Sequence, residues 1–158
     1  MNGAVRNPTA PARPAARRCR VAPASLALLE SARQGLATAA DESQSAARYV
    51  AAHLAALRAA AAVVAARAAP GSAPRRRGPR SVWELLPRVE PALAEWAAFF
   101  AAGAGKRAAA EAGLQRAVTP READDLLRDA ETFVSLAEEA LGVSRQPGQV
   151  PLPLRTAG

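Results

Sequence analysis

The stretch from residue 43 to residue 68, SQSAARYVAAHLAALRAAAAVVAARA, decides the fold class of this chain. Half of its residues are alanine, which has the highest helix propensity, and it contains no proline or glycine. The stretch therefore predicts a single helix roughly 40 Å long. Its apolar side chains recur at helical spacing, which predicts that they face the core of the protein. The expected core stripe is Ala46, Val50, Leu54 (or His53), Leu57, Ala61 and Val64.

The same composition extends over the whole chain. Of its 158 residues, 44 are alanine, whereas aromatic residues make up only 4%. A sequence this poor in strand-forming residues is not expected to form an all-β fold. Short polar connections between long helical segments are typical of antiparallel neighbours. The sequence therefore predicts an all-α protein, an up-and-down bundle of four main helices plus short helical pieces.

Capping residues place the other helices. Ser25 is the expected N-cap of the first helix. Ser81 and Thr119 each begin a capping box, with Glu84 and Glu122 three residues further on. Between the two capping boxes we expect a short helix, a restart at a proline, and an interruption at two glycines. These segments are 82–86, 91–102 and 106–112, with Gly103 and Gly105 between the last two.

The charge distribution divides the chain into a body and two ends. The formal net charge is +7. Residues 25–142 hold 14 basic and 14 acidic residues and are therefore neutral. The positive excess lies in residues 1–24, a proline- and arginine-rich arm expected to be disordered, and in the tail 143–158, also expected to be disordered. A basic face for nucleic acid on the helical body is therefore not predicted.

One loop inside the body concentrates positive charge. Residues 70–80 contain three prolines and two glycines, so they cannot continue a helix. If the protein contacts nucleic acid, the guanidinium groups of this loop are the candidates. They belong to Arg75, Arg76, Arg77 and Arg80.

Several functional classes are not expected. The single cysteine, Cys19, and the single histidine, His53, cannot form a zinc site of the usual kind or an internal disulfide. No cofactor is expected. Residues 59–66 form the longest uncharged apolar run, too short to span a bilayer, and no secretory signal is evident, so a cytoplasmic location without membrane contact is expected.

Two groups of polar residues could carry chemistry. Arg48 and His53 have the spacing R-x4-H, and such a pair could cleave RNA without metal, with His53 exchanging protons and Arg48 holding the phosphate. The alternative is that His53 packs in the core while Arg48 faces solvent. Asp124, Asp125 and Asp129 could hold a cation, or they form a solvated face near a helix N-terminus.

Four blocks of the sequence occur in an order that resembles a known family. They are Arg48–Leu57, Ser81–Leu86, Glu95–Ala101 and Arg121–Leu127. Together they resemble the small stand-alone HEPN (higher eukaryotes and prokaryotes nucleotide-binding) domains of actinobacteria. The resemblance covers about residues 25–142.

The resemblance implies a four- to five-helix bundle that is often dimeric. It also implies one of two functions. Many members are metal-independent ribonucleases with an R-x4–6-H motif, which Arg48 and His53 match in spacing, although Tyr49 stands where the motif has a polar residue. Other members bind nucleotides, RNA or protein partners without catalysis. We expect a non-catalytic interaction module, with the ribonuclease as the alternative, and a homodimer, RNA, a nucleotide or a protein as possible partners.

Overall fold

The computed structural model describes residues 20–68 and 81–143, which form five α-helices and no strand. The all-α prediction is confirmed. The arm and tail lie outside the described residues apart from residues 20–24 and 143, and so do the loop 69–80 and its four arginines. The helices are α1 (Pro23–Asp41), α2 (Ser45–Arg67), α3 (Val82–Val89), α4 (Ala94–Glu111) and α5 (Pro120–Ala140), with 3-10 turns at Pro91–Leu93 and Gln115–Ala117.

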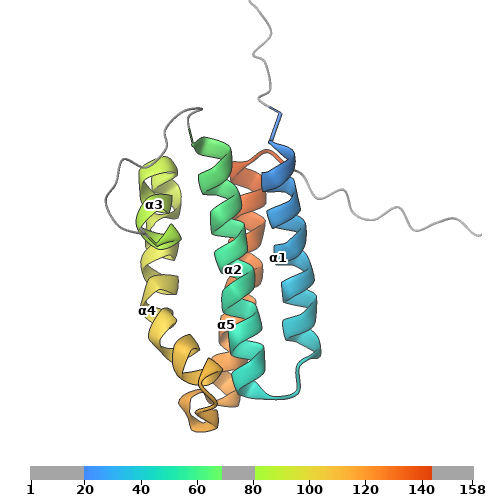
Figure 1. Cartoon of the computed structure of the whole chain (residues 1–158), viewed down its shortest axis with the longest axis vertical. Coiled ribbons are helices and arrows are strands. Elements are labelled where there is room, and N and C mark those ends of the chain that lie inside the picture. The colour runs from blue at the N-terminus through green and yellow to red at the C-terminus, as the bar shows by residue number, and fades with distance from the viewer. Residues whose placement is uncertain (1–19, 69–80, 144–158) are drawn as a thin grey trace, which may run out of the picture.

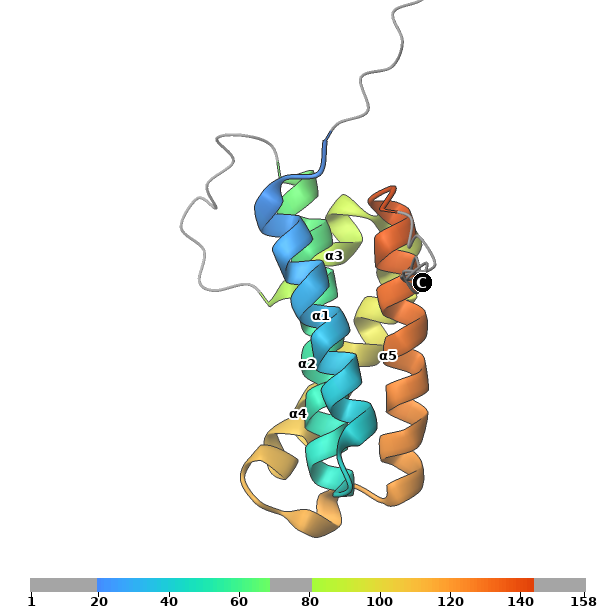
Figure 2. The same cartoon turned by 90° about the vertical axis from the view of Figure 1, so that its right-hand side faces the viewer.

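Helix α2 is the centre of the bundle, because it contacts α1, α3, α4 and α5. Figures 1 and 2 show α1 and α2 side by side and antiparallel, with α5 packed behind them and α3 and α4 on the opposite flank from α1. The turn between α1 and α2 is only three residues long, as expected for antiparallel neighbours.

The start of α1 differs from the prediction. The helix begins at Pro23, so residues 23 and 24, the last two of the arm predicted to be disordered, are helical. Its N-cap is Ala22 and not Ser25. Proline suits the first turn of a helix, where its missing N–H needs no partner. Ser25 lies inside the helix and is fully buried.

Helix α4 also differs from the prediction, because it runs through Gly103 and Gly105 without interruption. A Cβ atom at Gly103 would lie 3.0 Å from the Tyr49 hydroxyl, so this glycine allows α4 to pack closely on α2. Apart from its own helix, no described residue lies within 4 Å of the Cβ position at Gly105. Ser81 makes no side-chain cap to α3, which continues through Pro87 to Val89 rather than ending at residue 86.

The capping box of α5 is confirmed. The Thr119 hydroxyl accepts a hydrogen bond from the Glu122 backbone N–H at 3.2 Å, and the Glu122 carboxylate accepts one from the Thr119 N–H at 2.8 Å. Lys106 of α4 forms an ion pair with the same carboxylate. The Lys106 ammonium and the Thr119 donors together lower the pKa of Glu122 to about 2. This corner therefore ties the end of α4 to the start of α5.

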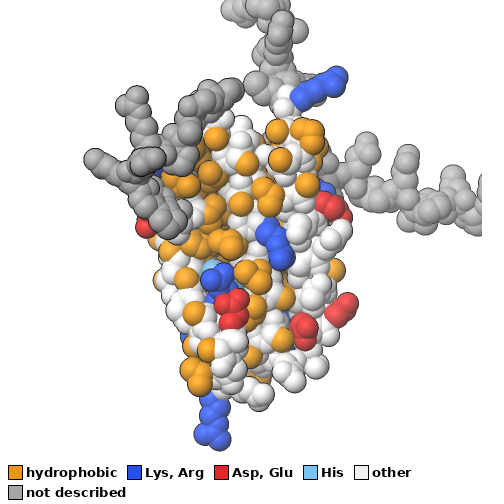
Figure 3. All heavy atoms as spheres, in the orientation of Figure 1, with side chains coloured by type: hydrophobic (Ala, Val, Ile, Leu, Met, Phe, Trp, Pro, Cys, Tyr) orange, Lys and Arg blue, Asp and Glu red, His pale blue; other side chains and the backbone are white. Residues whose placement is uncertain are grey.

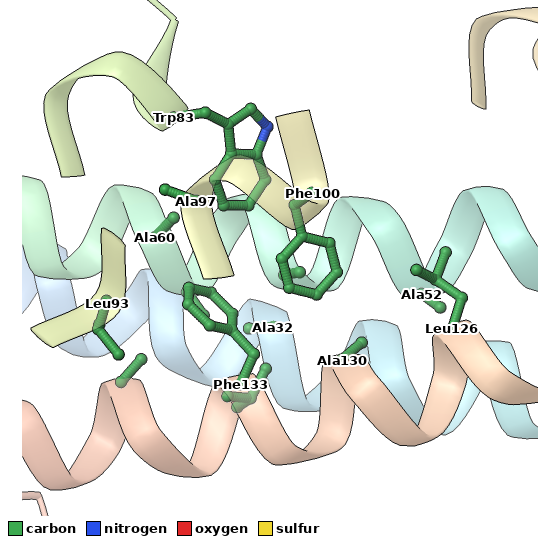
Figure 4. Close-up of a cluster of buried hydrophobic side chains, with 14 of the residues drawn as sticks. Ala32, Ala52, Ala60, Trp83, Leu93, Ala97, Phe100, Leu126, Ala130 and Phe133 are labelled. Carbon is green, nitrogen blue, oxygen red and sulfur yellow. The ribbon is translucent and has the colours of Figure 1, made fainter. Parts of the chain in front are cut away.

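The core combines small alanines with a few aromatic rings. Figure 4 shows Phe100 of α4 and Phe133 of α5 inserted against the alanine side of α2, with Trp83 of α3 stacked on Phe100. The ring centroids of Phe100 and Phe133 are 5.2 Å apart. Because alanine occupies so little space, the aromatic rings supply most of the apolar area in this layer.

The predicted core stripe of α2 is only partly right: its alternative member His53 is fully buried, and Leu57 and Val64 pack against the core without being fully buried. Its apolar members Val50, Leu54, Leu57 and Val64 are only half-buried. The fully buried side of α2 is instead the one that carries its smallest side chains and its histidine. It consists of Ala52, His53, Ala55, Ala56, Ala59, Ala60, Ala62 and Val63.

Candidate functional site

The imidazole of His53 is enclosed in the aromatic layer, and its solvent exposure is 0%. Its Nε2–H donates to the Phe100 carbonyl oxygen at 2.9 Å, which fixes the proton on Nε2. Trp83 and Phe100 contact the ring edge-on, at centroid distances of 6.0 and 5.8 Å. Nδ1 has no partner among the described residues. In this arrangement His53 ties α2 to the backbone of α4.

The surroundings of His53 favour the neutral imidazole. Burial lowers its pKa, and the positive charge of Arg107 lowers it further. The hydrogen bond to the Phe100 carbonyl and the charge of Glu111 act in the opposite direction. A general acid in RNA cleavage must gain and lose a proton at a solvent-accessible position, and a buried neutral ring is poorly suited to that task.

Arg48 is engaged elsewhere in the bundle. Its Nε and Nη2 donate to the Glu42 carbonyl oxygen, at 3.1 and 2.7 Å, beyond the last turn of α1. Its Nη1 forms an ion pair with Asp124 of α5. The guanidinium thus joins the α1–α2 turn to α5, and no hydrogen bond joins it to His53 within the described residues.

Alanine in place of Arg48 is expected to lower the free energy of unfolding by about 1–2 kcal/mol, because charged hydrogen bonds to the Glu42 carbonyl are lost. Asparagine in place of Asp124 is the matched change, and it should cost less because the bonds to Glu42 remain. Urea unfolding followed by circular dichroism measures both. Equal stability of Arg48→Ala and wild type would show that these contacts do not hold the turn.

Two of the three candidate aspartates of α5 form ion pairs with different arginines. Asp124 pairs with Arg48, and Asp125 pairs with Arg128. Burial, and then repulsion from Asp125, raise the pKa of Asp129. Among the described residues, no group of three or more histidine, cysteine, aspartate or glutamate side chains is arranged to hold a metal ion.

The structure leaves partly uncovered a stripe of α2 that the sequence predicted to lie in the core. In Figure 1 helix α2 is flanked by α1, α3 and α4, and no described helix lies in front of it. The side chains on this side of α2 are half-buried. Figure 3 shows hydrophobic side chains gathered over this face, with few charged groups among them. We call it the open face of α2, and it consists of Val50, Leu54, Leu57, Ala61 and Val64. Its regular spacing was visible in the sequence, but its exposure was not.

Of the helices that the structure describes, α2 is long and apolar enough to cross a membrane. Length and composition alone support that property, and half of its most apolar segment is buried inside the bundle. Central helices of helical bundles have the same character.

The comparisons with known proteins identify the family. A family model of HEPN-like domains matches residues 39–138, well over half of the chain. The chain belongs to the HEPN-like domain family. No curated protein and no solved structure matches it. The match begins at the end of α1 and includes the open face of α2, Arg48 and His53, so these features lie within the HEPN-like domain itself.

Proposed function

We propose that this HEPN-like domain is a non-catalytic interaction module that binds a protein partner through the open face of α2. The observation that carries the proposal is the complete burial of His53 in the aromatic layer. The R-x4-H mechanism would need that imidazole, because the sequence contains no second histidine that could replace it.

The charge of the described body supports a protein partner over RNA. The described residues hold 11 basic and 14 acidic side chains, a net charge of −3. RNA binding draws its affinity from neutralised phosphates, so a negative body offers little attraction. The open face of α2, by contrast, is apolar and only half-buried, and apolar surface that is incompletely covered marks sites of protein contact.

The test is RNA cleavage in the presence of a metal chelator by the full chain, beside His53→Gln and Arg48→Lys. Glutamine can still donate an N–H toward the Phe100 carbonyl, so the first variant is designed to remain folded. We expect no cleavage above the buffer rate from any of the three. Cleavage by wild type that both folded variants lose would overturn the proposal and establish the ribonuclease instead.

A further inference from the structure

The open face of α2 has the spacing of a helix-packing seam. Its residues follow one another at intervals of four, three, four and three. This is the 3.5-residue repeat with which one helix packs along another. Each of the five side chains is half-buried, so the described helices cover this stripe of α2 only in part. The pattern predicts that a further helix completes it.

A groove adjoins the first half of the seam. It has a volume of about 630 Å³ and is lined by Val50 and Leu54 of the seam, by α1, and by residues at the end of α4 and just after it. Two polar side chains of its α1 wall, Gln34 and Thr38, already make hydrogen bonds within α1. The Thr38 hydroxyl donates to the Gln34 carbonyl oxygen at 3.0 Å. The wall therefore makes little demand for a strongly polar ligand.

One charged group in this groove lacks a partner. Arg58 is half-buried, and no described residue forms an ion pair or a side-chain hydrogen bond with it. Its Nη1 lies 3.1 Å from the Cβ position of Gly35, so the guanidinium rests on α1 where a larger residue would crowd it. By contrast, the other described cations either pair with an acid or are exposed to solvent. The paired ones are Arg33, Arg48, Arg67, Lys106, Arg107, Arg121 and Arg128, and the exposed ones are Arg20, Arg88 and Arg116.

We propose that the open face of α2 and the adjoining groove bind an amphipathic helix of a partner protein, with a carboxylate of that helix on Arg58. The inference rests on the proposed interaction function and names the kind of partner. Arg58 directly follows Leu57 of the seam, a flanking position at which charged residues select the partner helix. Burying Arg58 beneath a helix without a carboxylate would leave an unpaired charge.

The charges in the groove distinguish this occupant from the alternatives. A nucleotide carries several phosphate charges, whereas Glu111 also lines the groove, so Arg58 would be opposed by a carboxylate there. A second copy packing α2 against α2 would offer Arg58 no acid, because residues 45–67 contain neither aspartate nor glutamate. An acidic amphipathic helix from another protein satisfies both the seam and the guanidinium.

The experiment is a selection from a phage-displayed library of helical peptides of about 14 residues, roughly four turns, against the full chain. We expect the selected peptides to carry apolar residues at i, i+3, i+4 and i+7 and to be enriched in aspartate or glutamate beside them. Their affinity should fall about tenfold or more for Arg58→Glu, and also fall for Arg58→Gln. Lysine in place of the peptide acid should restore binding to Arg58→Glu. Arg88→Glu, the same charge change at an exposed site on α3, should bind like wild type.

Peptides that bind wild type and Arg58→Glu equally would overturn this inference, and so would a selection without any Arg58-dependent binder. Thermal unfolding of both Arg58 variants establishes that they are folded. The cleavage assay distinguishes the two proposals. If the selected peptides bind independently of Arg58 and the chain does not cleave RNA, the proposed interaction function is retained. Only the groove is then excluded as its binding site.

Discussion

Alanine in place of Phe100 is expected to lower the free energy of unfolding by about 3–5 kcal/mol. The ring is fully buried and is the hub of the aromatic layer. Its centroid lies 5.3 Å from that of Trp83, 5.2 Å from that of Phe133 and 5.8 Å from that of His53. Small domains are stable by only about 5–15 kcal/mol, and the neighbouring alanines of α2 cannot refill the space that the ring leaves.

Phe99 provides a matched control for this substitution. It is the adjacent residue on the same helix and has the same side chain, but 45% of it is exposed to solvent. Phe99→Ala should cost about 1–1.5 kcal/mol, since only about half of this side chain is buried. Urea denaturation followed by circular dichroism gives both free energies. Similar losses for the two variants would contradict the central packing role assigned to Phe100.

The second large effect is a loss of stability in acid that depends on His53. Burial lowers the pKa of His53 in the folded protein below its ordinary value of 6.5. Below that pH the unfolded chain binds a proton that the folded chain does not, so acid favours unfolding. The His53 contribution to stability is complete above pH 6.5 and is lost as the pH falls. The loss can approach about 1.4 kcal/mol per pH unit until the folded pKa is reached.

Leucine in place of His53 removes the titrating group and keeps an apolar side chain in the layer. The free energy of unfolding of His53→Leu should therefore vary less between pH 7 and pH 5 than that of wild type. Glu122 does not titrate in this pH range. Its pKa of about 2 in the folded protein means that its contribution to stability is lost only below about pH 4.5. Parallel stability curves for wild type and His53→Leu between pH 7 and pH 5 would refute the assignment.

The structure also explains why the spacing of Arg48 and His53 could not show whether they form a catalytic pair. The R-x4-H pattern places Arg48 and His53 five residues apart, about 140° apart around the helix. The partners that engage them are distant in the chain, Phe100 for His53 and Asp124 for Arg48. Whether a histidine is accessible depends on such long-range neighbours, which local spacing does not contain.

Helix boundaries were predictable where one local interaction decides them. Thr119 and Glu122 close a capping box within four residues, and the structure has it as predicted. Gly103 was misjudged as an interruption, because its effect depends on Tyr49 of another helix. A glycine weakens an isolated helix, but the close packing of α4 on α2 that it permits offsets that cost.

Alanine content and capping residues were sufficient to predict the all-α class and the start of α5, because both depend on residues close together in the chain. Which side of α2 is inside depends on its packing partners from other helices. Its alanine side is buried because small side chains leave room for the rings of Phe100 and Phe133. The larger apolar residues Leu54 and Leu57 therefore remain only half-buried on the open face, a position that their hydrophobicity alone would not predict.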